Sequence, residues 1–223
     1  MLKKLLKTRK KKWDSSFRNL KKIPPWRGRE QLDVLERALD EGWIPQNGKL
    51  VDIGCGNGTL TLRLAQRTSC SVLGIDISTV ALDQARALAS KHAPDVKARL
   101  SYQDVDILHS TTFSKAYRHV FGVATDVGCF HNFEAESQQR FIAERIHEML
   151  TANGKWLLVK RAFRGDNEED YPMEQERMTE GIKHVTAGLF NLKRVEPCDL
   201  TGPNAQQKMP GLAFYLEKSQ EPC

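Results

Sequence analysis

Several features that would mark a membrane, secreted or zinc-binding protein are missing from this chain of 223 residues. No apolar run approaches the ~20 residues that a membrane-spanning helix needs, and the N-terminus lacks the apolar stretch of roughly 7–15 residues found in a secretory signal. The five cysteines are scattered and odd in number, without a C-x-x-C pair, and no H-x-x-x-H occurs. We therefore expect a reduced, cytoplasmic protein with no transmembrane segment, no disulfide framework and no metal site.

Excess positive charge is also missing from most of the chain, although the whole sequence carries a formal net charge of +6. Residues 1–22 hold ten Lys or Arg against the single acid Asp14, a net of +9, so the remaining body must carry −3. A body of that sign does not resemble a nucleic-acid-binding surface. The charge belongs to a basic N-terminal arm, residues 1–22, and residues 23–223 have the length of one α/β domain.

Three interpretations of this arm remain open. The first is a solvated, partly disordered extension. The second is a segment that contacts a membrane surface or an anionic partner, and the third is a tail that contacts RNA. We also expect that removing residues 1–22 costs little thermal stability.

The most informative stretch is residues 51–59, Val-Asp-Ile-Gly-Cys-Gly-Asn-Gly-Thr. It has the pattern of a buried strand with an acid near its end, Asp52, then a turn with Gly54, Gly56 and Gly58, then the start of a helix. Glycines in such a turn supply positive φ, or a backbone bare enough for a ligand to lie against it. The first amides of the helix are free to bind a carboxylate or phosphate.

A second apolar run, residues 72–75, ends at Asp76. A Rossmann-like sheet places the acid that binds both ribose hydroxyls there, roughly twenty residues after the glycines. The glycine spacing is not the G-x-G-x-x-G of a dinucleotide site, and the turn lacks the Gly-Lys-Ser/Thr ending of a phosphate-binding loop. The two segments together predict a nucleoside ligand.

The rest of the chain alternates strand and helix patterns. Strands are expected at 50–53, 71–76, 98–102, 119–126 and 154–161, helices at 30–41, 59–67, 78–91, 137–150 and 174–187, and final strands at 192–197 and 212–217. This order predicts an α/β fold with a Rossmann-like, doubly wound seven-stranded sheet, mostly parallel with an antiparallel last strand. The acidic residues 164–173 are expected to form a loop over the site.

An acid ends or follows each of the first four predicted strands: Asp52, Asp76, Asp104 and Asp126. In a doubly wound sheet the ligand binds beyond the carboxyl ends of the strands, where the strand order reverses. Each acid alone also has a structural interpretation, since Asp at a strand end commonly caps the next helix. Asp106 is an adjacent alternative to Asp104. The four together predict one ligand site at this edge.

Over residues 24–218 the chain resembles the class I S-adenosylmethionine-dependent methyltransferases. Residues 51–58 resemble their motif I, and residues 126–131, Asp-Val-Gly-Cys-Phe-His, resemble motif IV. The resemblance implies S-adenosylmethionine as cofactor, with an acid facing its ammonium group, the turn facing its carboxylate, and later residues holding ribose and adenine. The implied cofactor-binding residues are Trp26, Asp52, Gly54, Gly56, Gly58, Asp76, Ile77, Asp104, Val105 and Asp126.

Within this class, Ile23-Pro24-Pro25-Trp26 and motif IV are similar to small-molecule enzymes of the thiopurine, thiol and tellurite-resistance type. In those enzymes an aromatic segment before the core closes over the methyl donor, and Trp26 matches it. Arg27 stands where they commonly carry an acid. A Trp26 that merely covers the core is the alternative.

The resemblance implies in-line transfer of a methyl group to a small-molecule nucleophile on sulfur or another chalcogen, oxygen or nitrogen. The leaving group is neutral, so the protein mainly orients the reactants and excludes water. A thiol, with a pKa of about 8.5, needs little help from a base. His131 is the best candidate for a base or an acceptor-positioning group, and a packing role is its alternative.

Two other functions remain open. An RNA or protein methyltransferase would use the basic arm, and a non-catalytic protein would bind S-adenosylmethionine as a sensor or scaffold. The Asn/Asp-Pro-Pro-Tyr/Phe tetrapeptide common in enzymes that methylate exocyclic base nitrogens is absent, which counts against one nucleic-acid subtype. An apolar acceptor pocket is expected from residues 13–30, 130–133 and 163–175.

Overall fold

The computed structural model describes residues 2–19, 32–109, 111–162, 171–201 and 209–220. The strands are β1 (Lys49–Ile53), β2 (Ser71–Asp76), β3 (Leu100–Asp104), β4 (Phe121–Val127), β5 (Leu150–Arg161), β6 (Phe190–Asp199) and β7 (Pro210–Lys218). The α-helices are α1 (Leu2–Arg18), α2 (Asp33–Asp40), α3 (Thr59–Arg67), α4 (Thr79–Ala89), α5 (Pro94–Ala98), α6 (Thr111–Ala116), α7 (Glu136–Met149) and α8 (Tyr171–Thr186). Two short 3₁₀ helices are η1 (Ile107–His109) and η2 (Phe130–Asn132).

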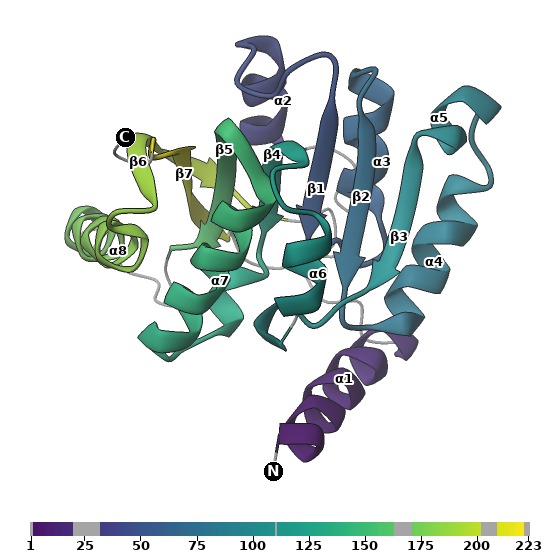
Figure 1. Ribbon diagram of the computed structural model, residues 1–223, viewed down its shortest axis with the longest axis horizontal. Coiled ribbons are helices and arrows are strands. Elements are labelled where there is room, and N and C mark those ends of the chain that lie inside the picture. The colour runs from purple at the N-terminus through teal and green to yellow at the C-terminus, as the bar shows by residue number, and fades with distance from the viewer. Residues whose placement is uncertain (1, 20–31, 110, 163–170, 202–208, 221–223) are drawn as a thin grey trace.

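The strands form one sheet in the order β3-β2-β1-β4-β5-β7-β6 (Figure 1). Strands β1 to β5 pair in parallel, whereas β7 runs antiparallel between β5 and β6. The predicted seven-stranded, mostly parallel α/β sheet with an antiparallel last strand is confirmed. The strand order reverses between β1 and β4, which is where a doubly wound sheet opens a crevice for a ligand.

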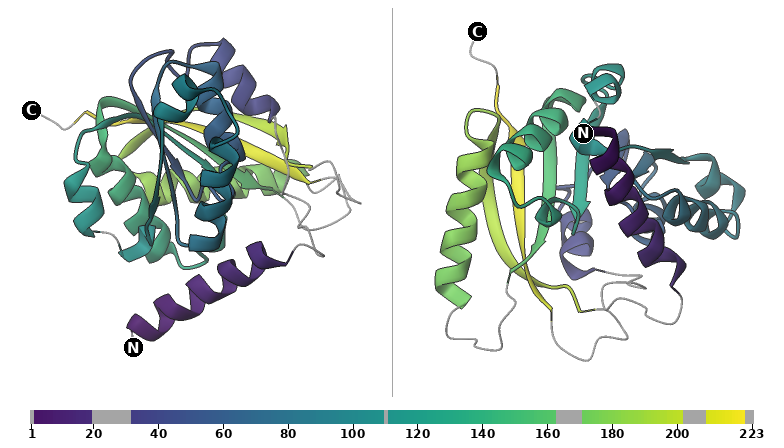
Figure 2. Two further views of the ribbon diagram at one scale, coloured as in Figure 1. Left: turned by 90° about the vertical axis from the view of Figure 1, so that its right-hand side faces the viewer. Right: turned by 90° about the horizontal axis from the view of Figure 1, so that it is seen from below.

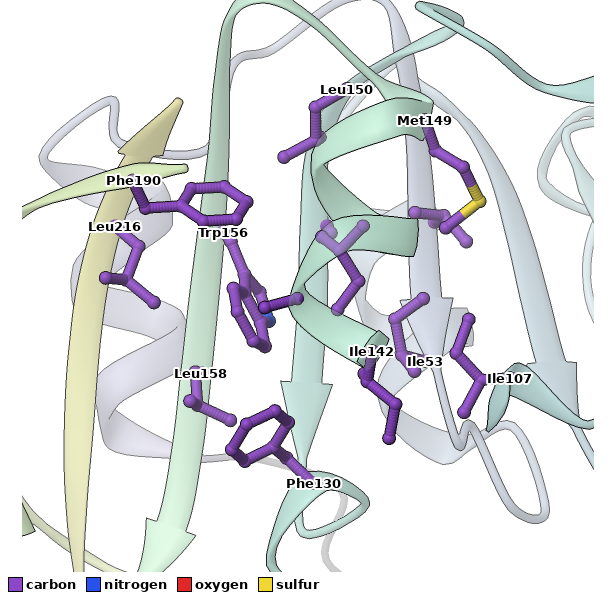
Figure 3. Packing of buried hydrophobic residues seen from close by; sticks show 14 of the residues in the cluster. Ile53, Ile107, Phe130, Ile142, Met149, Leu150, Trp156, Leu158, Phe190 and Leu216 are labelled. Atoms are coloured by element: carbon purple, nitrogen blue, oxygen red, sulfur yellow. The ribbon is translucent and has the colours of Figure 1, made fainter. Parts of the chain in front are cut away.

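Helices cover both faces of the sheet, as the apolar periods of the sequence require. On one face α2 and α3 pack against β1, β2 and β5 through a buried cluster that includes Leu35, Leu64 and Leu157. On the other face α7 and α8 pack over a second cluster, whose residues around Trp156 appear in Figure 3. Both cores leave the carboxyl ends of β1 to β4 uncovered by these helices.

The N-terminal arm is a helix that packs on the rest of the chain, so a solvated, partly disordered extension, one of the three interpretations above, does not agree with the structure. The effect of removing the arm on thermal stability stays a prediction, and this packing argues for a larger cost than the sequence alone suggested. Residues 2–18 form α1, which lies across the carboxyl ends of the first strands, beside the start of α4 (Figures 1 and 2). Phe17 and Asp14 are buried in this contact. Among the described residues, no helix combines the length and the apolar character needed to cross a membrane.

Candidate active site

The predicted acids fall at the same edge of the sheet. Asp76 and Asp104 are register partners at the ends of β2 and β3, and Asp126 lies opposite Ile53 at the end of β1. Because the strands are parallel, their carboxyl ends meet here with the glycine turn that follows β1.

The three glycines of the turn all adopt positive φ, with values of 66° for Gly54, 56° for Gly56 and 77° for Gly58. Their surroundings differ. A β-carbon on Gly54 would lie 2.5 Å from Cβ of Cys129, and one on Gly58 would lie 2.7 Å from Cβ of Ala85 in α4. Gly54 and Gly58 therefore allow close packing, while a β-carbon on Gly56 would meet only the ring of Phe17, 3.1 Å away.

Asp76 connects the glycine turn to the start of α4 by hydrogen bonds. Its Oδ2 accepts a hydrogen bond from the Gly56 amide at 2.9 Å, and its Oδ1 accepts one from the Ser78 amide at 2.8 Å. Burial raises the pKa of Asp76 from its usual value, against these two hydrogen bonds. Ser78 caps α4 through its hydroxyl, as a serine at this position predicts.

Asp52 lies deeper, between β1, β4 and α3. One carboxylate oxygen accepts from the Thr61 hydroxyl at 2.6 Å and the other from the Thr125 hydroxyl at 2.8 Å. Burial raises the pKa of Asp52 to about 6, in spite of both hydroxyls. The side chain ties three elements together at the base of the crevice, and its contact with an ammonium group stays a prediction.

A cavity of about 730 Å³ occupies this edge of the sheet. Among the predicted site residues, its walls include Asp52, Gly54, Gly56, Asp76, Ile77, Val105 and His131. The structure therefore brings together the residues that follow β1, β2 and β3 with the loop that follows β4. A volume of this size suits a small organic ligand.

Helix α1 forms a wall of the cavity that sequence reasoning did not assign to the methyl donor. Arg9, Lys12, Trp13 and Phe17 all line it. Trp13 and Phe17 were expected in the acceptor pocket, yet Phe17 packs directly over Gly56 of the motif I turn. The sequence does carry one indication of this wall, because the spacing of Lys10, Trp13, Asp14 and Phe17 places them on one face of a helix.

Asp126 does not reach the cavity wall. It is fully buried, and its Oδ1 accepts hydrogen bonds from the amides of Cys129 at 2.9 Å and Phe130 at 3.1 Å. Burial raises the pKa of Asp126 to about 7. Its carboxyl group therefore shapes the loop after β4, and that loop carries His131 to the cavity.

Asp104, predicted at the adenine edge, is not among the residues that line the cavity, although its register partner Asp76 is. Its carboxylate is half exposed and pairs with Lys10 at 3.0 Å. Asp106, the adjacent alternative, lines the cavity beside Val105 and pairs with Arg9 of α1. Gly58 is not among the residues that line the cavity, and the close approach of Ala85 in α4 accounts for a glycine there.

Two predicted segments lie outside the described residues. These are the Pro-Pro-Trp segment with Trp26, and residues 163–170 of the predicted acidic loop. The remaining residues of that loop belong to the start of α8. Glu174 and Arg177 of α8 line the far end of the cavity with Arg161, Leu200 and Met209.

The residues present fit S-adenosylmethionine. Gly56 offers a bare backbone at the cavity wall, and Asp76 offers a carboxylate there with Ile77 and Val105 as apolar neighbours. A carboxylate suits ribose hydroxyls, and apolar side chains suit an adenine face. No group of three or more His, Cys, Asp or Glu able to hold a metal occurs in the described part of the chain.

The chain matches known sequences over parts of its length. Residues 50–154 match a family described as "Methyltransferase domain". The tRNA1(Val) (adenine(37)-N6)-methyltransferase of Photobacterium profundum is 47% identical over 45 residues, 19% of each chain. EEF1A lysine methyltransferase 2 of Danio rerio is 26% identical over 139 residues, 60% of this chain and 57% of that protein. The chain thus spans less than two thirds of the length of either relative.

Solved structures share the fold at low identity. One, described as "Conversion of a Disulfide Bond into a Thioacetal Group during Echinomycin Biosynthesis", has a TM-score of 0.74 at 19% identity, covering 96% of this chain and 93% of the other. N-methyltransferase NodS from Bradyrhizobium japonicum WM9, in complex with S-adenosyl-L-homocysteine, has a TM-score of 0.66 at 16% identity, covering 95% and 98%. At these identities the likeness concerns the fold.

Proposed function

We propose that this protein, whose chain contains a class I S-adenosylmethionine-dependent methyltransferase domain, transfers the methyl group of that cofactor to a small-molecule nucleophile. The reacting atom of the acceptor is sulfur or another chalcogen, oxygen or nitrogen.

The observation that carries the small-molecule proposal is the set of walls around the cavity. The methyl-donor side is lined by the glycine turn and the segments after β2 and β3, and α1 lies over it. The opposite side is lined by η2, the end of β5 and α8. Walls on all these sides favour a compact acceptor over a polymer that must reach the methyl group from outside.

The bound cofactor supplies an electrophilic methyl carbon and a neutral leaving group. The protein orients the cofactor and the acceptor and excludes water from the reacting atoms. Asp76 and the turn hold the adenosyl and amino-acid parts, and α1 limits the access of water. His131, on the loop held by Asp126, is placed to orient the acceptor or to take its proton.

A second candidate is a methyltransferase that acts on protein or RNA. The two partial relatives are named for a lysine and a tRNA adenine acceptor. Lys7, Lys11 and Arg18 lie on the exposed side of α1 and could attract an anionic macromolecule. The −3 charge of the body weighs against a broad nucleic-acid surface.

A product assay separates these candidates. Purified full-length protein is incubated with S-adenosylmethionine and a panel of thiols, phenols, amines, bulk tRNA and a protein extract, and formation of S-adenosyl-L-homocysteine is measured. We expect turnover with a small thiol, phenol or amine, and its loss in Asp76→Ala. Turnover with tRNA or protein only would contradict the small-molecule proposal. Donor binding without any turnover would favour a sensor.

A further inference from the structure

We propose that α1 is an integral wall of the methyl-donor site and that Asp14 is a positioning residue for Asp76, acting through Ser78. Binding of the methyl donor and docking of α1 are then coupled. The inference rests on the donor site proposed above.

A chain of hydrogen bonds links α1 to the glycine turn. The Ser78 hydroxyl donates to Oδ1 of Asp14 at 2.7 Å, while its amide donates to Oδ1 of Asp76 at 2.8 Å. The other oxygen of Asp76 accepts from the Gly56 amide at 2.9 Å. The oxygen of the Ser78 hydroxyl also accepts from the Ala81 amide at 3.2 Å, so both its donor and its acceptor directions are used. Ser78 is thereby fixed between Asp14 and Asp76.

Burial makes this chain of bonds strong. Asp14 and Ser78 are both buried, and a carboxylate that accepts a hydrogen bond away from water is costly to leave without its partner. Asp14 also faces the N-terminus of α4, where the Val80 amide approaches it at 3.4 Å. A negative charge is favourable at that end of a helix.

Four further contacts fasten α1 around the methyl-donor side of the cavity. Phe17 packs over Gly56, and its carbonyl accepts a hydrogen bond from Gln84 of α4 at 3.1 Å. Lys10 donates to the Ile77 carbonyl at 2.8 Å, and Arg9 pairs with Asp106. The contacts reach the turn after β1 and the segments after β2 and β3.

These segments are the ones that line the donor side of the cavity, so a ligand bound there favours the arrangement in which α1 is docked. Coupling between two events is reciprocal. Binding of the methyl donor should therefore slow the local opening of α1, and weakening the attachment of α1 should weaken donor binding.

The test uses full-length protein and S-adenosyl-L-homocysteine as the probe. Its dissociation constant is measured by titration calorimetry for Asp14→Ala, for the conservative Asp14→Asn, and for Lys11→Ala as a matched control on the exposed side of α1. We expect Asp14→Ala to weaken binding roughly tenfold. We expect Asp14→Asn, which keeps an acceptor oxygen for Ser78, to recover most of the affinity, and Lys11→Ala to match the wild type.

Hydrogen exchange supplies a second measurement that does not depend on activity or on any variant. In the wild-type protein, saturation with S-adenosyl-L-homocysteine should slow exchange of the amides of residues 7–18 severalfold. Unchanged exchange there, or wild-type affinity in Asp14→Ala together with a lowered melting temperature, would overturn the inference, because α1 would then contribute stability only.

The failure of this inference is distinguishable from the failure of the proposed function. If the wild-type protein does not bind S-adenosyl-L-homocysteine, the donor site itself is wrong. If the wild type binds, Asp76→Ala binds weakly and Asp14→Ala binds normally, the donor site stands and the coupling to α1 is refuted.

Discussion

Replacing Gly54 by alanine tests how tightly the motif I turn packs against the loop after β4. The added β-carbon would lie 2.5 Å from Cβ and 2.7 Å from Sγ of Cys129. The residue also has a φ of 66°, a conformation that costs a non-glycine residue about 1–2 kcal/mol. Overpacking typically costs a further 1–3 kcal/mol or so. We expect Gly54→Ala to lower the free energy of unfolding by about 2–5 kcal/mol.

A second substitution separates the two contributions. Cys129→Gly removes the clashing atoms and keeps the backbone amide that donates to Asp126. In the Cys129→Gly background only the backbone cost remains, so Gly54→Ala should then cost about 1–2 kcal/mol. The two substitutions are therefore predicted to be non-additive by about 1 kcal/mol or more.

The assay is urea unfolding of the wild type, both single variants and the double variant, followed by circular dichroism and fluorescence to check two-state behaviour. If Gly54→Ala costs the same free energy in both backgrounds, Cys129 does not pack against the turn and the derived geometry of the loop is refuted.

Four other predictions concern single features of the site. Asp76→Ala should weaken binding of S-adenosyl-L-homocysteine about tenfold or more in calorimetry, because a charged acceptor is lost; an unchanged isotherm would contradict the ribose role. Gly58→Ala, whose β-carbon would meet α4 at 2.7 Å, should lower the melting temperature while changing donor affinity little, and the opposite pattern would place Gly58 at the ligand. Burial raises the pKa of Asp126 to about 7, so between about pH 4 and 7 the folded protein keeps a proton on this carboxyl group that the unfolded chain has released. The free energy of unfolding of the wild type should therefore fall as pH rises through this range. In urea unfolding at several pH values, Asp126→Asn should lack the part of this pH dependence that one proton contributes, and an identical slope would contradict the burial. Deleting residues 1–19 should lower the melting temperature by roughly 3–12 °C, since burial of a side chain such as Phe17 contributes about 1.5–3 kcal/mol; an unchanged melting temperature would show that α1 is not packed.

Much of the fold could be predicted because its signals are local. The strand 71–76 and the helix 59–67 have the bounds expected from their apolar periods, and Ser78 caps α4 as its residue type indicates. The mostly parallel pairing of the strands follows from the alternation of strands and helices, whereas the strand order is known only from the structure. The short helices α5 and α6 were not expected, since segments of five or six residues show too little periodicity.

The parts that could not be predicted depend on contacts between distant residues. Asp14 meets Ser78 across 64 positions, and nothing in the arm itself shows that partner. An acid at a strand end can line the cavity, as Asp76 does, or hold the following loop, as Asp126 does, and the two arrangements have the same sequence pattern. Asp104 and Asp106 lie two positions apart, and the path of the chain after β3, which the sequence pattern does not show, decides that Asp106 lines the cavity.

The most direct test of the central claim is a crystal structure of the protein with S-adenosyl-L-homocysteine. The account predicts one molecule across the carboxyl ends of β1, β2 and β3, with its ribose at Asp76 and α1 over it. A ligand found at another place, or a crevice that stays empty at saturating concentration, would contradict the account.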